Sequence, residues 1–269
     1  MPRTLVIGLV LALTACSSST ALAPRPDPGV SVEMRKQMLI AECMRQEGFT
    51  YVPFEARLAD TSAVSRRELA ARRGFGAFAH LAVPDDPVAN YWLAYDKDPN
   101  IKLRQALSLT QRRAWAKAFG RCFVVAVKRL TGKTVKDFVD YQMSYGKEVH
   151  AAVSRELDTD PYLLRLAKAY STCLSARGVR HASSKPTEIT GAVSRPFHDE
   201  LHAISGKTKN GLPVVPNMSP EAAKPYFERE VRAALIDTDC GQTFRNAYFP
   251  RRAQLSAPYA KAWAMPVQG

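Results

Sequence analysis

Apolar residues recur at three- and four-residue spacing along most of the chain, and this pattern predicts helices. The clearest case is residues 161–178, where Asp160 suits an N-cap, proline occupies the first helical position and Gly178 suits a left-handed C-terminal residue. The apolar stripe of this helix consists of Leu163, Leu166, Tyr170 and Leu174. Cys173 lies beside the stripe, so its sulfur is expected to face protein.

An earlier segment, residues 32–47, repeats this plan. Cys43 is followed after five residues by Gly48, just as Cys173 is followed by Gly178. Each helix therefore carries a cysteine about one turn before its end. This correspondence suggests that the chain contains two related halves.

Further helices are predicted over residues 111–131 and from residue 134 to about 157. Ser219 starts another helix whose first turns we expect Pro225 to break or kink, and a last short helix is expected within residues 256–265. No long alternation of apolar and polar residues indicates a sheet. The predicted fold is therefore predominantly all-α, with two related helical halves and long irregular loops.

One long segment, residues 179–218, lacks helical periodicity and is rich in Gly, Pro, Ser, Thr and Lys. We expect an irregular insertion with one or two helical turns around residues 197–204. The folded part is then divided into a first helical unit (32–132), a connecting helix (133–160) and a second helical unit (161–269).

The start of the chain has the features of an export signal. Arg3 precedes an apolar run that is too short to span a bilayer, and the run ends in Leu13-Thr14-Ala15-Cys16, which resembles a bacterial lipobox. We predict a lipoprotein signal peptide over residues 1–15, acylation of Cys16 and a flexible tether over residues 16–31. The alternative is an ordinary secretory signal with an incidental cysteine. Acylation would place the protein on the extracytoplasmic side of the cell membrane.

Four cysteines remain after Cys16, and in an exported chain they indicate two disulfides. Three connectivities are possible. We favour Cys43–Cys122 with Cys173–Cys240, because each bond then closes one half in the same way. A zinc site is the rival, but none of these cysteines belongs to a CxxC motif or a closely spaced Cys/His pair.

The formal net charge of +13 includes the arginine doublets Arg66-Arg67 and Arg72-Arg73. For an exported protein this charge favours contact with anionic lipid or a cell-wall polymer over nucleic acid. The alternative, which we favour, is a solvated basic surface without a specific partner.

The candidate for metal chemistry is His198-Asp199-Glu200-Leu201-His202. Histidines four residues apart share a helix face and could bind zinc, but the metalloprotease motif requires Glu where Asp199 stands. The alternative is a pair of exposed histidines in a loop. The sequence has no GxSxG, SxxK or glycine-rich phosphate loop, so no catalytic residue and no cofactor is predicted.

Short spaced motifs resemble a group of exported actinobacterial lipoproteins. They lie in residues 39–51, 120–122, 160–178 and 230–240. The chain departs from the group after Gly178, where Val179-Arg180-His181 replaces an expected glycine–aromatic segment. The resemblance implies export, lipidation and paired cysteines, but no catalytic residues.

The sequence thus predicts a membrane-anchored extracytoplasmic lipoprotein, most simply a non-catalytic interaction or cell-envelope protein. One alternative is a cell-envelope hydrolase that uses the 179–218 loop. The other is a carrier with a small-ligand cleft between the halves.

Overall fold

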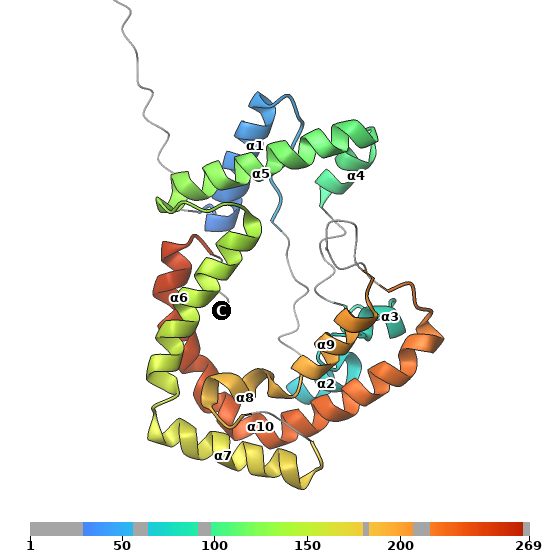
Figure 1. Ribbon diagram of the computed structural model, residues 1–269, viewed down its shortest axis with the longest axis vertical. Coiled ribbons are helices and arrows are strands. Elements are labelled where there is room, and N and C mark those ends of the chain that lie inside the picture. Colours follow the sequence, from blue (N-terminus) through green and yellow to red (C-terminus); the bar gives the residue numbers. More distant parts are fainter. Residues whose placement is uncertain (1–28, 56–63, 91–97, 180–182, 207–215, 266–269) are drawn as a thin grey trace, which may run out of the picture. The chain divides into compact units, whose positions relative to one another are not determined.

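The computed structural model describes residues 29–55, 64–90, 98–179, 183–206 and 216–265, and the regular structure within them is entirely helical (Figure 1). The predicted all-α class is confirmed. The helices are α1 (Val32–Gln46), α2 (Arg66–Arg73), α3 (Ala79–Ala82), α4 (Pro99–Gln105), α5 (Leu109–Thr131), α6 (Phe138–Leu157), α7 (Pro161–Ala176), α8 (Pro186–Ala192), α9 (Arg195–Ile204) and α10 (Pro220–Ala262).

The helices α1 to α10 belong to one compact unit. The predicted signal peptide and Cys16 lie outside the described residues. No helix in the described part of the chain is both long enough and apolar enough to cross a bilayer.

Both cysteine helices begin and end as their sequences predict. Ser31 caps α1 by accepting a hydrogen bond from the amide of Met34, and Asp160 caps α7 through the amide of Leu163. Gly48 and Gly178 follow these helices with φ of 81° and 75°, a left-handed conformation that glycine adopts without a steric penalty.

The first hydrophobic core joins α1, α5, the start of α6 and the end of α10. Its buried residues include Ile40, Met44, Trp115, Phe123, Val127, Tyr141 and Trp263. The Tyr141 hydroxyl donates a 2.6 Å hydrogen bond to the carbonyl of Trp263, so the last turn of α10 is fixed to α6.

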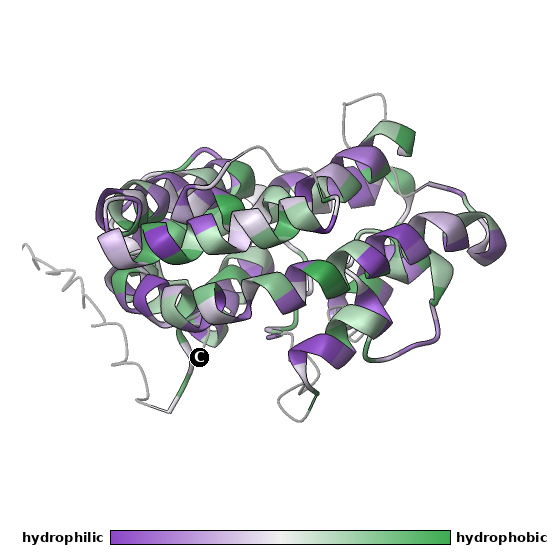
Figure 2. Ribbon diagram, turned by 90° about the horizontal axis from the view of Figure 1, so that it is seen from below, coloured by the Kyte–Doolittle hydropathy of each residue, from purple (hydrophilic) through white to green (hydrophobic). Residues whose placement is uncertain are grey.

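The second core joins the end of α6 with α7, α8 and the middle of α10. Its buried residues include Val153, Leu157, Leu163, Tyr170, Leu174, Ile189, Phe244 and Tyr248. Hydrophobic and hydrophilic positions are mixed along these helices, as expected where one face is buried and the other is solvated (Figure 2).

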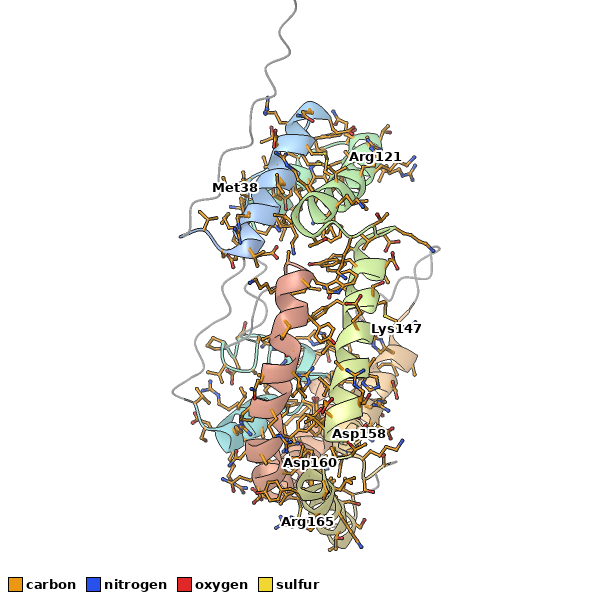
Figure 3. The ribbon with its side chains drawn as sticks, turned by 90° about the vertical axis from the view of Figure 1, so that its left-hand side faces the viewer. Met38, Arg121, Lys147, Asp158, Asp160 and Arg165 are labelled. Carbon is orange, nitrogen blue, oxygen red and sulfur yellow. A yellow bond between two sulfur atoms is a disulfide. The ribbon has the colours of Figure 1, made fainter. Side chains whose placement is uncertain are left out.

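Two aspartates secure the corner between α6 and α7 (Figure 3). The carboxylate of Asp158 accepts hydrogen bonds of 2.8 and 2.7 Å from the amide and the hydroxyl of Thr187, which hold the start of α8. Asp160, besides capping α7, forms an ion pair of 2.7 Å with Arg251 of α10.

The two disulfides are Cys43–Cys122 and Cys173–Cys240, so the favoured connectivity is confirmed. The first joins α1 to α5 and the second joins α7 to α10, with Cα–Cα distances of 5.5 and 5.6 Å. They close loops of 79 and 67 residues, and in the loop-entropy model each stabilises the fold by about 4 kcal/mol.

The C-terminal half differs from the sequence predictions in its helix boundaries. The helix that begins after Ser219 is not broken at Pro225 but runs continuously to Ala262, and it includes most of the segment expected to be a separate last helix. The insertion 179–218 is less irregular than expected, since α8 and α9 lie within it. Burial of Ile189 in the second core stabilises α8 despite its Gly and Thr content.

Packing crosses the predicted unit boundaries. Helices α2 and α3, from the predicted first unit, pack against α10 of the second. Around this contact Phe78 and Leu81 bury against Ala223, with Phe197, Leu201 and Phe227 packed beside them. Helix α10 therefore contacts every hydrophobic core described.

Glu230 of α10 holds this third cluster together. Its side chain is fully buried, and its carboxylate oxygens accept hydrogen bonds of 2.7, 2.8 and 2.9 Å from the amides of Phe75, Ala77 and Phe78. Burial raises the pKa of Glu230, an effect that these amides and the nearby His198 partly offset.

Glu230→Gln is expected to lower the free energy of unfolding by about 1–3 kcal/mol, because its amide group would point a donor at a backbone donor. The native-state pKa lies above the ordinary value of 4.5, so the folded protein keeps the carboxyl proton of Glu230 to a higher pH than the unfolded chain does. Titration of Glu230 therefore favours the folded state most below pH 4.5, and this stabilisation falls as the pH rises through the native pKa.

Urea denaturation of the wild type and Glu230→Gln across acidic to neutral pH measures both effects. The exposed neighbour Glu228→Gln is the control. Equal stability of the two variants at every pH would contradict the assigned role of the buried carboxylate.

Candidate functional site

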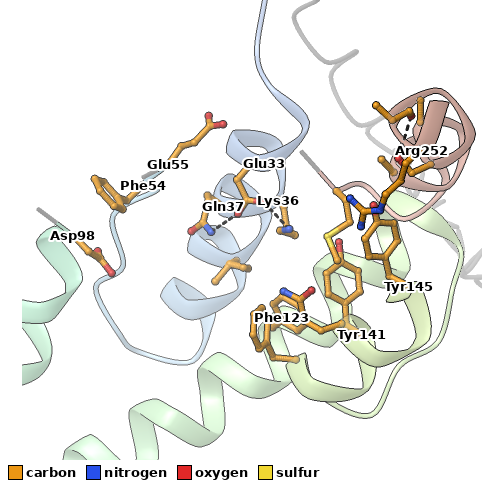
Figure 4. A pocket seen from close by; sticks show the side chains of 18 of the residues that line it. Glu33, Lys36, Gln37, Phe54, Glu55, Asp98, Phe123, Tyr141, Tyr145 and Arg252 are labelled. Atoms are coloured by element: carbon orange, nitrogen blue, oxygen red, sulfur yellow. Dashed lines mark hydrogen bonds and ion pairs between the residues drawn. The ribbon is translucent and has the colours of Figure 1, made fainter. Parts of the chain in front are cut away.

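A cleft of about 1270 Å³ is lined by residues of α1, α5, α6 and α10, and Figure 4 shows Tyr141 and Tyr145 of α6 on the same side of it as Arg252 of α10, with α1 facing them. The segment after α1 contributes Tyr51, Phe54 and Glu55, and Asp98 joins them from the start of α4. The cleft thus separates residues of the predicted first unit from the α10 wall of the second.

One face of α1 lines the cleft with polar side chains that bind one another. Lys36 is only 5% exposed, and its Nζ lies 2.6 Å from the carboxylate of Glu33 and 5.3 Å from the ring centre of Tyr141. Gln37 donates a hydrogen bond of 2.9 Å to Glu33 and accepts one of 2.6 Å from the hydroxyl of Tyr51. These bonds preorganise the α1 wall, because each side chain is held by its neighbour.

Aromatic rings form the apolar part of the lining. Tyr51 and Phe119 have ring centres 5.7 Å apart, and Phe123 meets Tyr141 edge-on at 5.4 Å. Phe138 packs edge-on against Phe123 at the same distance. These contacts belong to the first core, so this side of the cleft is an extension of a packed interior.

On α10, residues that line the cleft recur every three or four positions. Arg245, Phe249, Arg252 and Ser256 occupy successive turns on the face toward the cleft. Arg66 of α2 adds a further cation, and its guanidinium lies 5.9 Å from the ring centre of Phe249. This wall is therefore positively charged.

Arg245 is fixed from behind by a buried network. It forms an ion pair with Asp237, donates a 2.7 Å hydrogen bond to the carbonyl of Asp237, and donates another of 2.9 Å to the hydroxyl of Tyr170. Tyr170 in turn donates to the carboxylate of Asp237. Burial raises the pKa of Asp237, while the charge of Arg245 lowers it in part.

The titratable phenols of the cleft are poorly suited to acid–base chemistry near neutral pH. Burial raises the pKa of Tyr51 and of Tyr141, and nearby carboxylates raise both further. Each phenol therefore stays protonated and already donates its hydrogen to a protein acceptor. The arrangement suits binding better than proton transfer.

The predicted metal residues are not brought into a metal site by the described structure. His198 and His202 lie on α9, and the described residues contain no group of three or more His, Cys, Asp or Glu side chains placed to hold a metal ion. His198 instead lies near the buried Glu230, whose pKa it helps to lower.

The four arginines predicted to contact anionic surfaces lie on α2, and each of them has a contact within the fold. Arg67 forms an ion pair with Asp239, and Arg72 forms one of 2.7 Å with Asp86. Arg66 faces the cleft, as described above. The guanidinium of Arg73 lies against Gly76, where an added Cβ would approach it to 2.5 Å. The doublets thus help to position α2, and Arg67 remains 62% exposed.

The residues that line the cleft were not predicted as a site from the sequence. Glu33, Lys36 and Gln37 share one face of a predicted helix, which was the available signal. Nothing in the sequence pairs that face with Arg252, more than two hundred residues later. Comparison with protein-family models, curated proteins and solved structures gives no match.

A substitution at Gly241 tests the buried network of Arg245, Asp237 and Tyr170. A Cβ at this position would lie 2.6 Å from Nη1 of Arg245 and 2.9 Å from Cζ of Tyr170, both in the buried network. Gly241→Ala is therefore expected to lower the free energy of unfolding by about 1–3 kcal/mol.

The matched control is Gly120→Ala in α5, where an added Cβ meets nothing within 4 Å. There the better helix propensity of alanine should stabilise the protein by about 0.5–1 kcal/mol. Thermal or urea unfolding of both variants decides the point, and equal stabilisation by the two substitutions would refute the crowding at Gly241.

Proposed function

We propose that this protein is a lipid-anchored extracytoplasmic binding protein without catalytic activity, and that its cleft holds a ligand with substantial apolar surface. The observation that carries the proposal is the cleft itself. At about 1270 Å³ it exceeds the usual size of a small-molecule site, and its lining combines aromatic rings with charged and amide side chains.

The state of the polar groups supports binding over hydrolysis. Lys36, Gln37, Tyr51 and Tyr141 are engaged with protein partners and are held in fixed positions. A binding site benefits from such preorganisation, because little side-chain freedom is lost when the ligand enters.

The anchor rests on the N-terminal sequence. Leu13-Thr14-Ala15-Cys16 follows a short apolar run, and a Ser- and Pro-rich stretch comes after it. The two disulfides are consistent with an oxidising compartment outside the cytoplasm. Acylation would hold the protein at the membrane while leaving the cleft accessible.

Cys16→Ser is expected to move the protein from the membrane fraction to the soluble fraction, because the acylated thiol is lost. Membrane fractionation and mass spectrometry of the N-terminal peptide measure this, with Ser17→Ala as the control that stays on the membrane. Retention of Cys16→Ser in the membrane fraction, with no acyl mass on the wild type, would refute lipid anchoring.

The cleft can be tested with N-phenylnaphthylamine, an uncharged apolar dye whose fluorescence rises on leaving water. We expect the wild type to bind it and Ala253→Trp to weaken binding about tenfold or more, because the indole would fill space at the α10 wall (about 1.4 kcal/mol).

Gln254→Trp is the matched control, since it adds the same side chain to an exposed position next to Ala253 that is not among the cleft-lining residues. Absence of dye binding, or equal weakening by both variants, would refute a ligand-binding cleft.

A further inference from the structure

The two sides of the cleft carry opposite charge. From this arrangement, and given the proposed binding function, we infer that the ligand is a short apolar peptide with free termini. Its carboxylate lies toward Arg66 and Arg252, and its amino group lies toward Glu55 and Asp98. Figure 4 shows Arg252 on the opposite side of the pocket from Glu55 and Asp98, with the paired Glu33 and Lys36 between them.

The positive side has two cations that the fold does not neutralise. Lys36 is paired with Glu33, and Arg245 is paired with Asp237. Within the described ranges, Arg66 and Arg252 form no ion pair with a carboxylate, and both side chains are exposed. A carboxylate between these guanidiniums would gain charge-assisted hydrogen bonds.

The negative side has two carboxylates with unused acceptor capacity. Glu55 accepts a hydrogen bond of 2.6 Å from the hydroxyl of Ser31, through Oε2. Asp98 uses Oδ1 for the amide and the side chain of Asn100, at 2.9 and 2.7 Å. Among described residues neither carboxylate has a cationic partner within 4.0 Å, so both carry negative charge that the described part of the fold does not neutralise.

The middle of the cleft offers groups that match a peptide backbone between apolar side chains. Gln142 and Asn246 line it, and in the described structure their amides have no hydrogen-bond partner. Each side-chain amide presents a donor and an acceptor, as a peptide group does. The rings of Phe119, Phe123 and Phe249 supply apolar surface for the side chains of the peptide.

A ligand with charge at one end only would satisfy one side and leave the other without a partner. A fatty acid would meet Arg66 and Arg252 but would place apolar carbon against Glu55 and Asp98. Desolvating those carboxylates without a cation is unfavourable. Separated charges of both signs on one apolar molecule therefore match the cleft best.

The experiment uses a set of unblocked pentapeptides made of alanine, leucine and valine, with the same peptides acetylated at the N-terminus or amidated at the C-terminus. Binding to the full-length protein is measured by calorimetry. We expect the free peptides to bind, and each cap to weaken binding about two- to fivefold, as for a partly exposed ion pair.

The charge assignments are tested by pairing variants with caps. Arg252→Gln should weaken binding of free peptides and have no effect on amidated ones, since the ion pair is already absent. Glu55→Gln should weaken the binding of free peptides and leave the binding of acetylated peptides unchanged. Arg113→Gln removes the same charge from an exposed position on α5 outside the cleft and should change neither.

The outcomes separate the two proposals. Suppose that the uncharged dye binds the wild type, that it binds Ala253→Trp more weakly, and that no pentapeptide binds. The peptide assignment is then wrong and the binding cleft stands. The assignment is also overturned if neither cap changes the affinity for the peptides, or if Arg252→Gln and Arg113→Gln change that affinity equally. If neither dye nor peptide binds, both proposals fail.

Discussion

The structure depends on one helix being shared between separate hydrophobic cores. Helix α10 places Phe244 and Tyr248 in the second core and Trp263 in the first. Cys240 fixes it covalently to α7, and the hydrogen bond from Tyr141 to the carbonyl of Trp263 fixes its end to α6. Because these attachments lie on the same rigid element, the position of one core constrains the position of the other.

The cleft follows from this constraint. Between its contacts with the two cores α10 presents one face to the cleft, which is lined there by residues from Arg245 to Ser256. The opposite side is built on α1, which Cys43 joins to α5. Several polar side chains at the cleft are held by protein partners, as Arg245 is by Asp237 and Lys36 is by Glu33.

The sequence predicted local features well, because they depend on neighbouring residues. The helices around Cys43 and Cys173, their caps and the disulfide connectivity could all be anticipated from spacing and from the repeated plan. Two local predictions failed because tertiary contacts prevailed. Pro225 was expected to break or kink the first turns of α10, but packing against α3 keeps the helix continuous there, and α8 forms where Ile189 is buried.

The cleft could not be predicted, because it depends on which helix faces meet. Lys36 and Arg252 are far apart in the sequence, and no periodicity connects them. The metal hypothesis for His198 and His202 had the opposite difficulty. Their spacing was suggestive on its own, but the fold places no third ligand beside them among the described residues.

The prolines inside α10 give its uncovered face a mechanical property. Pro250 lines the cleft and has no amide hydrogen to donate to the carbonyl of Asn246, one turn earlier. A helix resists bending least where its ladder of hydrogen bonds is interrupted. At that turn the straightness of α10 therefore depends on the packing of Tyr248 in the second core and of Trp263 in the first, more than on its own hydrogen bonds.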